Sequence, residues 1–283
     1  MLNPTMLQNL CRSALAEDVG SGDATTLAVV PADAEVTACI VVREDCVCAG
    51  LPAAEAVFRE LDADVVFETV VEDGQACCTD QVLAEIRGRA RAILTGERTA
   101  LNFLQRLSGI ATLTRRYVNA VGRHKTRILD TRKTTPLLRM LEKYAVRTGG
   151  GDNHRLGLYD RIMIKDNHRI LAGFDGPNAI SRAVNACREM YPRLEIEVEA
   201  DTLEQVEDAT DAGADIILLD NMSTDEMAAA VTCNGGRSLI EASGGITLER
   251  IPEIAACGVD FISVGALTHS ASAVDIGLDI EGA

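Results

Sequence analysis

The sequence predicts an α/β protein in which an α+β amino-terminal part is followed by a parallel α/β barrel. Two observations predict this class. Short β-rich runs in the second half recur about 22 residues apart, the length of a strand, a loop and a three-turn helix, so the strands should lie parallel. Nearly every run also finishes on a charged, polar or glycine residue, as strands do where an α/β barrel carries its active site.

Length and composition suit this class. A chain of 283 residues, 47% apolar and 25% charged, can form one large or two smaller globular domains. No apolar run approaches the roughly 18 residues of a membrane span, and the start lacks a secretory signal. Nine irregularly spaced cysteines indicate reduced thiols, so we expect a cytoplasmic protein with no membrane partner.

The spacing of apolar residues along the chain changes near residue 96. Before it, the apolar spacing predicts mixed elements: a helix over Thr5–Glu17, a turn over Gly20–Asp23, a strand over Val36–Val42, a helix over Ala53–Leu61, and strands over Val65–Val71 and Val82–Arg87. From Glu97 to Val121 apolar residues recur every three or four positions. This spacing predicts one long helix, or two helices joined at Ser108-Gly109.

The rest of the chain alternates strands with helical connections. A helix is expected over Leu137–Ala145. The expected strands are Arg127–Thr131, Arg161–Lys165, Leu194–Glu199, Ile216–Asp220, Ser238–Ala242 and Asp260–Val264.

Positive charge is concentrated in one segment of an acidic protein. All four lysines lie within 41 residues, from Lys125 to Lys165. Residues 127–169 hold ten Lys or Arg and five Asp or Glu, a balance of +5; the rest holds 17 basic and 38 acidic residues, or −21, which together give −16. A Debye length of about 8 Å lets the positive segment act locally. We therefore expect an anion site and no nucleic-acid partner; the acid excess also suggests a high-salt cytoplasm.

The positive residues fall at strand ends and beside the loop Gly149–Gly151. Arginine offers planar two-point binding to carboxylate or phosphate, and lysine offers a compact charge. The expected polyanion pocket, set against the alternative of a solvated basic face, comprises Arg132, Lys133, His154, Arg155 and Lys165. Lys165 also ends an apolar strand, which leaves open a Schiff-base lysine as in barrel aldolases.

Two carboxylates, Glu199 and Asp220, end consecutive strands and should lie near one another. Such a pair opposite a basic wall suits Mg²⁺ or ligand hydroxyls, with acid–base catalysis and plain salt bridges as alternatives. Glycine-rich turns follow the last two strands, where barrels commonly bind phosphate through backbone N–H groups. Their residues are Ser243, Gly244, Gly245 and Gly265. Together these features suit an activated phosphorylated sugar and a small polyanionic partner.

Several segments resemble the signatures of the quinolinate phosphoribosyltransferase family, the decarboxylating nicotinate-nucleotide pyrophosphorylases. The resemblance spans nearly the whole chain in the family's order. Its segments are Glu17–Thr26, Glu97–Thr112, Asp130–Pro136, Gly149–Tyr159, Lys165–His168, Glu197–Glu199, Leu219–Asn221, Glu241–Ile246 and Ile262–Ala271. Leu137, Asp152 and Arg161 depart from the pattern beside the expected ligands, where they would change affinity more than reaction type.

The resemblance implies a domain organisation and a homodimer. Residues 1–108 would form an α+β sandwich-like domain, and residues 109–283 an incomplete parallel α/β barrel. An alternative division assigns the last ~12 residues to the first domain. One subunit's first domain would cap the other's barrel, and assembly beyond the dimer stays open.

The resemblance also implies roles for individual residues. Quinolinate would lie on Arg132, His154, Arg155 and Lys165, with Arg98 arriving from the partner chain. Phosphoribosyl pyrophosphate and its Mg²⁺ would lie among Lys133, Glu199, Asp220, Ser243, Gly244, Gly245 and Gly265. The metal would be held by Glu199 and Asp220, and catalysis would fall to these two carboxylates with Lys133 and Lys165.

The implied reaction transfers phosphoribosyl from phosphoribosyl pyrophosphate to quinolinate with loss of CO₂. It gives nicotinate mononucleotide and pyrophosphate, a glycosyltransferase step of NAD biosynthesis. Three alternatives stay open at this point: a sister phosphoribosyltransferase of the same fold with another acceptor, a Schiff-base aldolase using Lys165, and a non-catalytic ligand-binding barrel.

Overall fold

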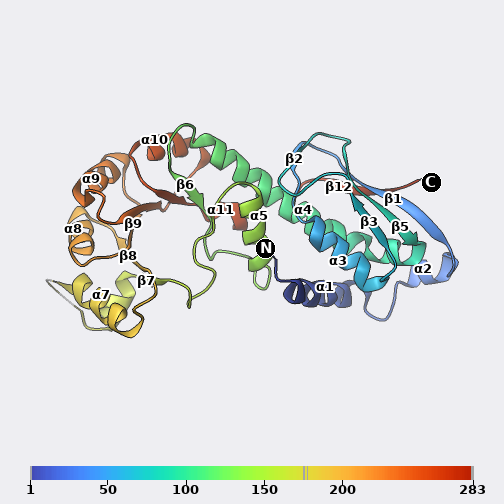
Figure 1. Ribbon diagram of the computed structural model, residues 1–283, viewed down its shortest axis with the longest axis horizontal. Coiled ribbons are helices and arrows are strands. Elements are labelled where there is room, and N and C mark those ends of the chain that lie inside the picture. The colour runs from blue at the N-terminus through green and yellow to red at the C-terminus, as the bar shows by residue number, and fades with distance from the viewer. Residues whose placement is uncertain (1, 175, 177, 282–283) are drawn as a thin grey trace. The chain divides into compact units, whose positions relative to one another are not determined.

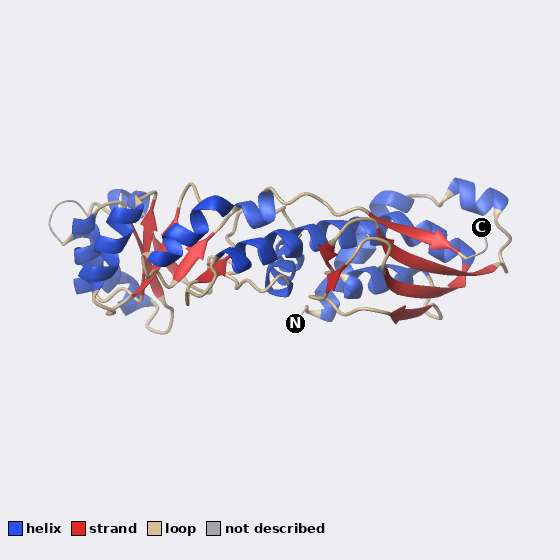
Figure 2. Ribbon diagram, turned by 90° about the horizontal axis from the view of Figure 1, so that it is seen from above, coloured by secondary structure: helices blue, strands red, loops and turns tan. Residues whose placement is uncertain are grey.

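The computed structural model describes residues 2–174, 176 and 178–281, and the chain divides into two compact units. The first contains Met1–Arg115, Thr135–Gly150 and Ser270–Ala283; the second contains Arg116–Thr134 and Gly151–His269. Each unit combines helices with strands (Figure 2), which confirms the predicted α/β class. The boundary expected between residues 108 and 109 stays a prediction.

The first unit is built on a four-stranded antiparallel sheet. Its elements are α1 (Pro4–Val19), α2 (Ala24–Val29), β1 (Glu35–Val42), β2 (Cys46–Val47), α3 (Leu51–Leu61), β3 (Val66–Thr69), β4 (Ala76–Cys77), β5 (Val82–Arg89), most of α4 (Ala90–Ala120), α5 (Arg139–Thr148) and β12 (Ile276–Ile280). The sheet order is β12-β1-β5-β3, and β2 pairs with β4 separately. The carboxyl-terminal strand therefore joins the amino-terminal sheet.

One face of this sheet forms the core of the first unit. Ala38, Ile40 and Val42 alternate along β1 and are each 0% exposed, because alternate residues of a strand share a face. On the same face, Phe67 of β3 meets Phe58 of α3 with ring centroids 6.2 Å apart. Helix α1 packs on α3 in turn (Figure 1). The unit is therefore the sandwich-like layer of helices on a sheet that was expected.

Helix α4 is one continuous helix of 31 residues, so the first of the two alternatives for this segment is correct. The close approach of another segment explains why α4 has a glycine at position 109. A methyl group there would lie 1.9 Å from the carbonyl oxygen of Ser272, so the carboxyl-terminal segment lies directly against the helix. The neighbouring hydroxyl of Ser108 accepts from the backbone N–H of Ala49 at 3.0 Å.

Three local predictions need correction. The helix expected over Leu137–Ala145 is shifted, because α5 begins at Arg139 and ends at Thr148. Leu137 has a φ of +68°, which no right-handed helix includes. The expected turn over Gly20–Asp23 leads into the unpredicted helix α2, where the Asp23 carboxylate accepts from the Thr26 N–H at 3.0 Å as an N-cap. Strand β12 was also missed.

The second unit is a parallel sheet with helical connections. Its elements are β6 (Arg127–Leu129), β7 (Ile162–Ile164), α6 (Asp166–Leu171), α7 (Ala179–Met190), β8 (Ile196–Ala200), α8 (Leu203–Asp211), β9 (Ile216–Asp220), α9 (Thr224–Asn234), β10 (Leu239–Ser243), the 3₁₀ turn η1 (Leu248–Arg250), α10 (Ile251–Ala256), β11 (Phe261–Ser263) and α11 (Ala266–His269). All six predicted strands are confirmed.

The sheet order is β6-β11-β10-β9-β8-β7, and every pairing is parallel. The first strand of this unit, β6, therefore lies at one edge of the sheet and the second, β7, at the other. An isolated parallel bridge joins Leu129 of β6 to Asp152, ahead of β7. Helices α7 to α10 follow the outer side of the curved sheet (Figure 1). This arrangement is the expected incomplete barrel.

Within the residues that the structure describes, no helix is both long enough and apolar enough to span a bilayer.

Candidate active site

A cavity of about 650 Å³ lies at the carboxyl ends of the strands of the second unit. Ten of the twelve residues predicted for the site line it. They are Arg132, Lys133, His154, Arg155, Lys165, Glu199, Asp220, Ser243, Gly244 and Gly245. Residues from both edge strands of the sheet reach this one cavity, so the curvature of the barrel gathers side chains that are far apart in the sequence.

The cationic side of the cavity is crowded with like charge. The Arg155 guanidinium donates to the carbonyl oxygen of Arg161 at 3.1 Å and contacts the sulfur of Met163 at 3.5 Å. Burial, followed by the positive charge of Arg132, lowers the pKa of Arg155 from its ordinary value. The two guanidinium groups therefore repel one another in the same cavity, and a bound anion would reduce this repulsion.

The loop that carries Lys133 is held at its backbone. The Lys133 N–H donates to the Thr131 hydroxyl at 3.0 Å, and its carbonyl oxygen accepts from the Thr268 hydroxyl at 2.7 Å. Gly265 is not part of the cavity lining, yet a methyl group on it would come within 3.1 Å of the Lys133 side chain. Gly265 thus lies next to the Lys133 side chain. Thr268, which the sequence did not single out, contacts the Lys133 backbone.

Glu199 and Asp220 stand on neighbouring strands, as predicted. Glu199 pairs in register with Leu218, so Asp220 lies two residues farther along β9 and on the same face. The Lys165 ammonium forms an ion pair with Glu199, with the two side chains 42% and 14% exposed. Asp220 accepts from the side-chain amide of Asn221 at 3.0 Å. The cavity thus places its acidic edge beside the cationic side chains.

The turn after β10 closes tightly against the end of β9. Asn221 has a φ of +56°, a left-handed conformation that asparagine tolerates better than most residues, and its N–H donates to the carbonyl oxygen of Ser243 at 3.0 Å. Gly244 has a φ of +88° and directly faces the Asn221 side chain. This pairing fixes the glycine-rich turn next to Asp220.

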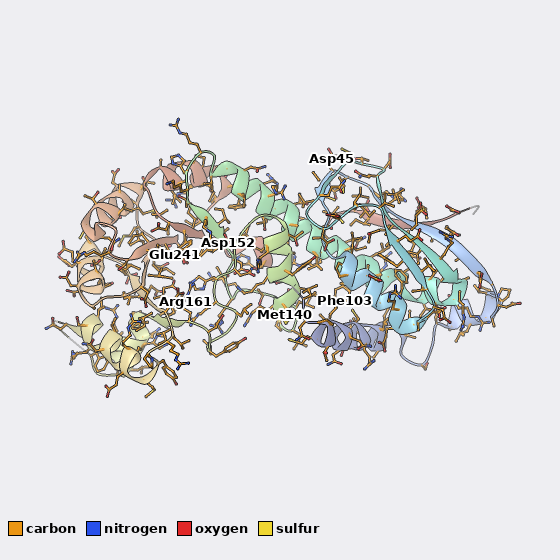
Figure 3. All side chains as sticks on the ribbon, viewed as in Figure 1. Asp45, Phe103, Met140, Asp152, Arg161 and Glu241 are labelled. Atoms are coloured by element: carbon orange, nitrogen blue, oxygen red, sulfur yellow. The ribbon has the colours of Figure 1, made fainter. Side chains whose placement is uncertain are left out.

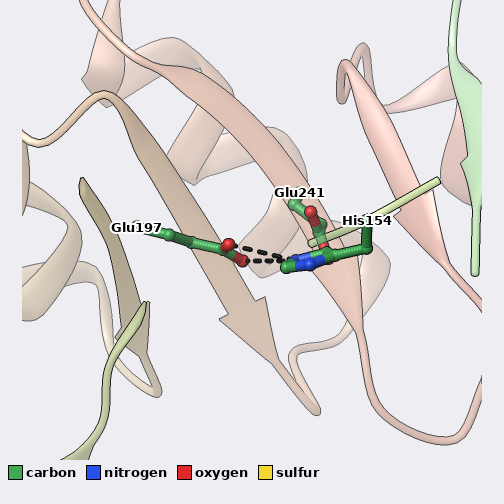
Figure 4. A group of neighbouring side chains, drawn as sticks. All are labelled: His154, Glu197 and Glu241. Atoms are coloured by element: carbon green, nitrogen blue, oxygen red, sulfur yellow. Dashed lines mark hydrogen bonds and ion pairs between the residues drawn. The ribbon is translucent and has the colours of Figure 1, made fainter. Parts of the chain in front are cut away.

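His154 faces inward, toward two glutamates that the site prediction did not include. Its Nε2 lies 3.0 Å from Glu197 and 3.6 Å from Glu241 (Figure 4). Its Nδ1 accepts from the backbone N–H of Arg155 at 2.7 Å, so Nε2 carries the proton. Asp130 accepts from the His154 N–H at 2.9 Å. His154 lines the cavity, but its ring nitrogens are engaged within the protein.

This group of three is sealed from solvent and strongly coupled. Glu197 and Glu241 are 0% exposed and His154 is 5% exposed. Burial opposes charge on the imidazole, but the hydrogen bond to Glu197 and the charge of Glu241 outweigh it, so the pKa of His154 is raised. Burial, and next the charge of Glu197, raises the pKa of Glu241 from 4.5 to about 7.

The sequence carried a signal for these two glutamates. Glu197 and Glu241 lie within the predicted strands Leu194–Glu199 and Ser238–Ala242. The structure has these strands at Ile196–Ala200 and Leu239–Ser243 and buries most of their residues. A carboxylate in the middle of a buried strand requires partners or neutralisation. Figure 3 marks Glu241 within the arc of the second unit. The glutamates were noticed only as parts of family motifs.

The other expected residues lie as follows. Arg98 is exposed on α4 in the first unit and is not among the cavity-lining residues. Asp152 pairs with Arg127 at 2.7 Å, and Arg161 pairs with Glu195 at 3.1 Å and Glu197 at 3.6 Å. Figure 3 labels Asp152 and Arg161. Two of the residues that depart from the family pattern, Asp152 and Arg161, are thus used in ion pairs and are not part of the cavity lining.

Comparison with known proteins shows the family of the chain. The family models for the N-terminal and C-terminal domains of quinolinate phosphoribosyl transferase match residues 23–108 and 110–279. The probable nicotinate-nucleotide pyrophosphorylase [carboxylating] of Bacillus subtilis is 43% identical over 99% of this chain and 95% of its own. The Mycobacterium leprae enzyme is 45% identical over 95% of each chain.

Solved structures give the same result. The crystal structure of NadC from Streptococcus pyogenes has a TM-score of 0.93 and 42% identity, covering 99% of both chains. The nicotinate-nucleotide pyrophosphorylase from Francisella tularensis has a TM-score of 0.92 and 39% identity over 99% of this chain and 98% of its own. The chain therefore belongs to the quinolinate phosphoribosyltransferase family.

Proposed function

We propose that this protein transfers the phosphoribosyl group of phosphoribosyl pyrophosphate to quinolinate and releases CO₂, forming nicotinate mononucleotide for NAD biosynthesis. One observation carries the proposal. In a member of this family, a single cavity holds Arg132, Arg155 and Lys165 together with the carboxylates Glu199 and Asp220. The cations match the two carboxylates of quinolinate, and the acidic edge matches a metal-bound sugar pyrophosphate.

Quinolinate is the ligand that best fits the cationic side. A charge-assisted hydrogen bond contributes on the order of 1.5–3 kcal/mol, so three such groups suffice for a small dianion. Arginine can grip a carboxylate at two points. A sister enzyme with an acceptor of one carboxylate would leave part of this charge uncompensated. His154 contributes by holding the Arg155 N–H at its Nδ1.

The acidic edge and the glycine-rich turn suit the second substrate. Carboxylate oxygens are preferred Mg²⁺ ligands, and Glu199 and Asp220 would hold the ion. Among the described residues no third carboxylate or histidine completes a cluster with them, so oxygens of the substrate would supply further ligands. When bound, Mg²⁺ would neutralise charge on the departing pyrophosphate. The turn Ser243–Gly245 would present backbone N–H groups to phosphate.

The chain needs no covalent nucleophile for this reaction. The cationic side orients quinolinate so that its ring nitrogen faces the anomeric carbon of the ribose, and Lys133 and Lys165 stabilise the negative charge that leaves with pyrophosphate. The ring then carries a positive charge, which accepts the electron pair freed when the carboxyl group beside nitrogen departs as CO₂. Fixed charge and positioning would supply most of the rate.

We also propose a homodimer in which the partner's Arg98 completes the quinolinate pocket. Support comes from the exposure of Arg98 on α4 and from the family pattern around it. The aldolase alternative is weakened because the Lys165 ammonium is paired with Glu199, whereas a Schiff base requires a free amine.

The test is a product assay. The purified protein is incubated with quinolinate, phosphoribosyl pyrophosphate and Mg²⁺, and nicotinate mononucleotide is measured by mass spectrometry. We expect product only when all three are present, and little or none when nicotinate replaces quinolinate. Absence of product from folded protein would refute the proposal; an adduct trapped by borohydride on Lys165 would favour the aldolase.

A further inference from the structure

We infer that Glu241 is the acid that protonates the pyridine carbon from which CO₂ departs. The inference rests on the proposed function, because only a decarboxylating reaction leaves a carbanion in this cavity. Nothing in the family pattern gave Glu241 this role. It follows from where the residue lies, from the groups that surround it and from the lack of another suitable proton donor among the described residues that line the cavity.

Glu241 lies in the middle of β10, and its side chain contributes to the cavity wall. It lines the cavity although the residue is 0% exposed. Neither carboxyl oxygen has a hydrogen-bond partner of ordinary geometry among the described residues. A buried carboxylate in that condition is costly, whereas a neutral carboxylic acid is much less so. The structure therefore favours a protonated Glu241 that faces the space where a substrate would bind.

The neighbouring charges favour the same state. Glu197 on β8 takes the hydrogen bond of His154 at 3.2 Å and also lies 3.6 Å from the Arg161 guanidinium. Glu241 is left with His154 at a more distant 3.6 Å. On β9 the neutral Leu218 stands opposite Glu241, and on β11 the neutral Ser263 hydroxyl interacts with it. The Arg161 cation and the Nε2 proton of His154 are thus closest to Glu197, which stays the anion of the pair.

Effects on acidity agree with this charge count. Burial and the charge of Glu197 raise the pKa of Glu241, and the charge of His154, the Ser263 hydroxyl and the charge of Arg161 reduce this effect without reversing it. A substantial fraction of the protein then carries the proton on Glu241 at the start of a turnover near neutral pH, and Glu241 can lose it to a strongly basic carbon.

The other groups that line the cavity are less suitable. Guanidinium groups do not act as acids in proteins, which removes Arg132 and Arg155. The His154 proton on Nε2 is held by Glu197. Lys133 and Lys165 could release a proton only by giving up the charge that holds an anionic substrate. Among the described residues that line the cavity, Glu241 can give up a proton without removing a positive charge that binds the remaining carboxylate and phosphates.

The proposed step balances. The bond between the ring carbon beside nitrogen and its carboxyl carbon breaks, CO₂ leaves, and the electron pair stays on the ring carbon next to the positive nitrogen. Glu241 then gives its proton to that carbon, a C–H bond forms and Glu241 becomes a carboxylate. Water restores the proton after the product leaves. Without this acid, the carbanion would recapture CO₂ before solvent protonates it.

The test compares Glu241→Gln with the wild type by measuring pyrophosphate and CO₂ in the same reaction. Glutamine keeps the size of the side chain but cannot donate a carboxylic proton. We expect CO₂ release to slow by about 100-fold or more, while the first equivalent of pyrophosphate is still released and the undecarboxylated nucleotide accumulates. Glu195→Gln is the matched control. Its side chain is 59% exposed and also pairs with Arg161, and it should keep one CO₂ per pyrophosphate.

A structural role for Glu241 would give different results. Equal loss of pyrophosphate and CO₂ in Glu241→Gln, or no loss of either, would overturn the inference. If that variant does not fold, the wild type decides through its pH profile: CO₂ per pyrophosphate should fall as pH rises and Glu241 ionises, and a constant ratio from about pH 6 to 9 would overturn it. Wild-type protein that makes no nicotinate mononucleotide would instead refute the proposed function.

Discussion

A methyl group added to Gly244 would lie 2.3 Å from the side-chain oxygen of Asn221. The same Asn221 donates to Asp220 through its amide nitrogen at 3.0 Å and to Ser243 through its backbone N–H at 3.0 Å. The absence of a side chain at Gly244 therefore allows Asn221 to hold the end of β9 against the end of β10. The acidic edge of the cavity depends on this contact.

Gly244→Ala should weaken use of phosphoribosyl pyrophosphate. The added methyl group must displace Asn221 and with it the hydrogen bond to Asp220. Overpacking of this kind lowers stability by about 1–3 kcal/mol, and we expect the KM for phosphoribosyl pyrophosphate to rise roughly tenfold or more. Gly236→Ala is the control, since Gly236 has a similar φ of +76° with nothing within 4 Å of the added methyl. Equal KM values in the two variants would contradict this account of Gly244.

Arg132→Ala should lose most quinolinate turnover while staying folded. The substitution removes one cationic group from the cavity, where a charge-assisted hydrogen bond contributes about 1.5–3 kcal/mol, so kcat/KM for quinolinate should fall about 10- to 150-fold. Steady-state kinetics and a thermal melt check both parts. Arg123→Ala removes an exposed arginine outside the cavity and should leave kcat/KM unchanged. Near-normal kcat/KM in Arg132→Ala would remove Arg132 from the site.

Stability should depend on pH through Glu241. Its pKa is raised from 4.5 to about 7 in the folded protein, so between about pH 5 and 7 the folded state keeps a proton that the unfolded chain has released. This contribution is present at low pH and is lost as pH rises through the folded pKa. Relative to Glu241→Gln, the free energy of unfolding of the wild type should fall by on the order of 2–3 kcal/mol from pH 5 to 8. Denaturant titrations measure it, and parallel curves for the two proteins would count against a buried neutral acid.

A site shared between chains should allow complementation. Arg98→Ala and Lys165→Ala proteins should each be nearly inactive alone. After subunits are exchanged, a mixed dimer contains one pocket with both residues intact, so part of the activity should return, up to about a quarter of the wild-type value for random pairing of equal amounts. Exchange is verified by native mass spectrometry with one isotopically labelled partner. No recovery despite proven exchange would place Arg98 outside the partner's pocket.

The sequence predicted the barrel strands well because each has a local apolar pattern and a polar end. Strand ends of a parallel sheet meet at one edge, so ten predicted site residues line one cavity although they are spread from Arg132 to Gly245. Strand β12 was missed because its pairing with β1 joins distant parts of the chain, which leaves no local signal. The start of α5 was misplaced because the positive φ of Leu137 is unusual for leucine.

The inner glutamates show a second limit. Motif comparison marked the segments that contain Glu197 and Glu241, but only coordinates reveal that both face His154. A carboxylate in a buried strand indicates that something neutralises it, without saying whether a cation, a proton or a ligand does so. That choice depends on distances between side chains from three separate segments.

The central claim is that the cations of the cavity recognise an acceptor with two carboxylates. Calorimetric titration of the protein with quinolinate and, separately, with nicotinate tests this most directly, because the two acids differ by one carboxyl group. We expect quinolinate to bind at least tenfold more tightly, and the difference to shrink in Arg132→Ala as one charge-assisted contact is lost. Equal affinity of the wild type for both acids would contradict the claim.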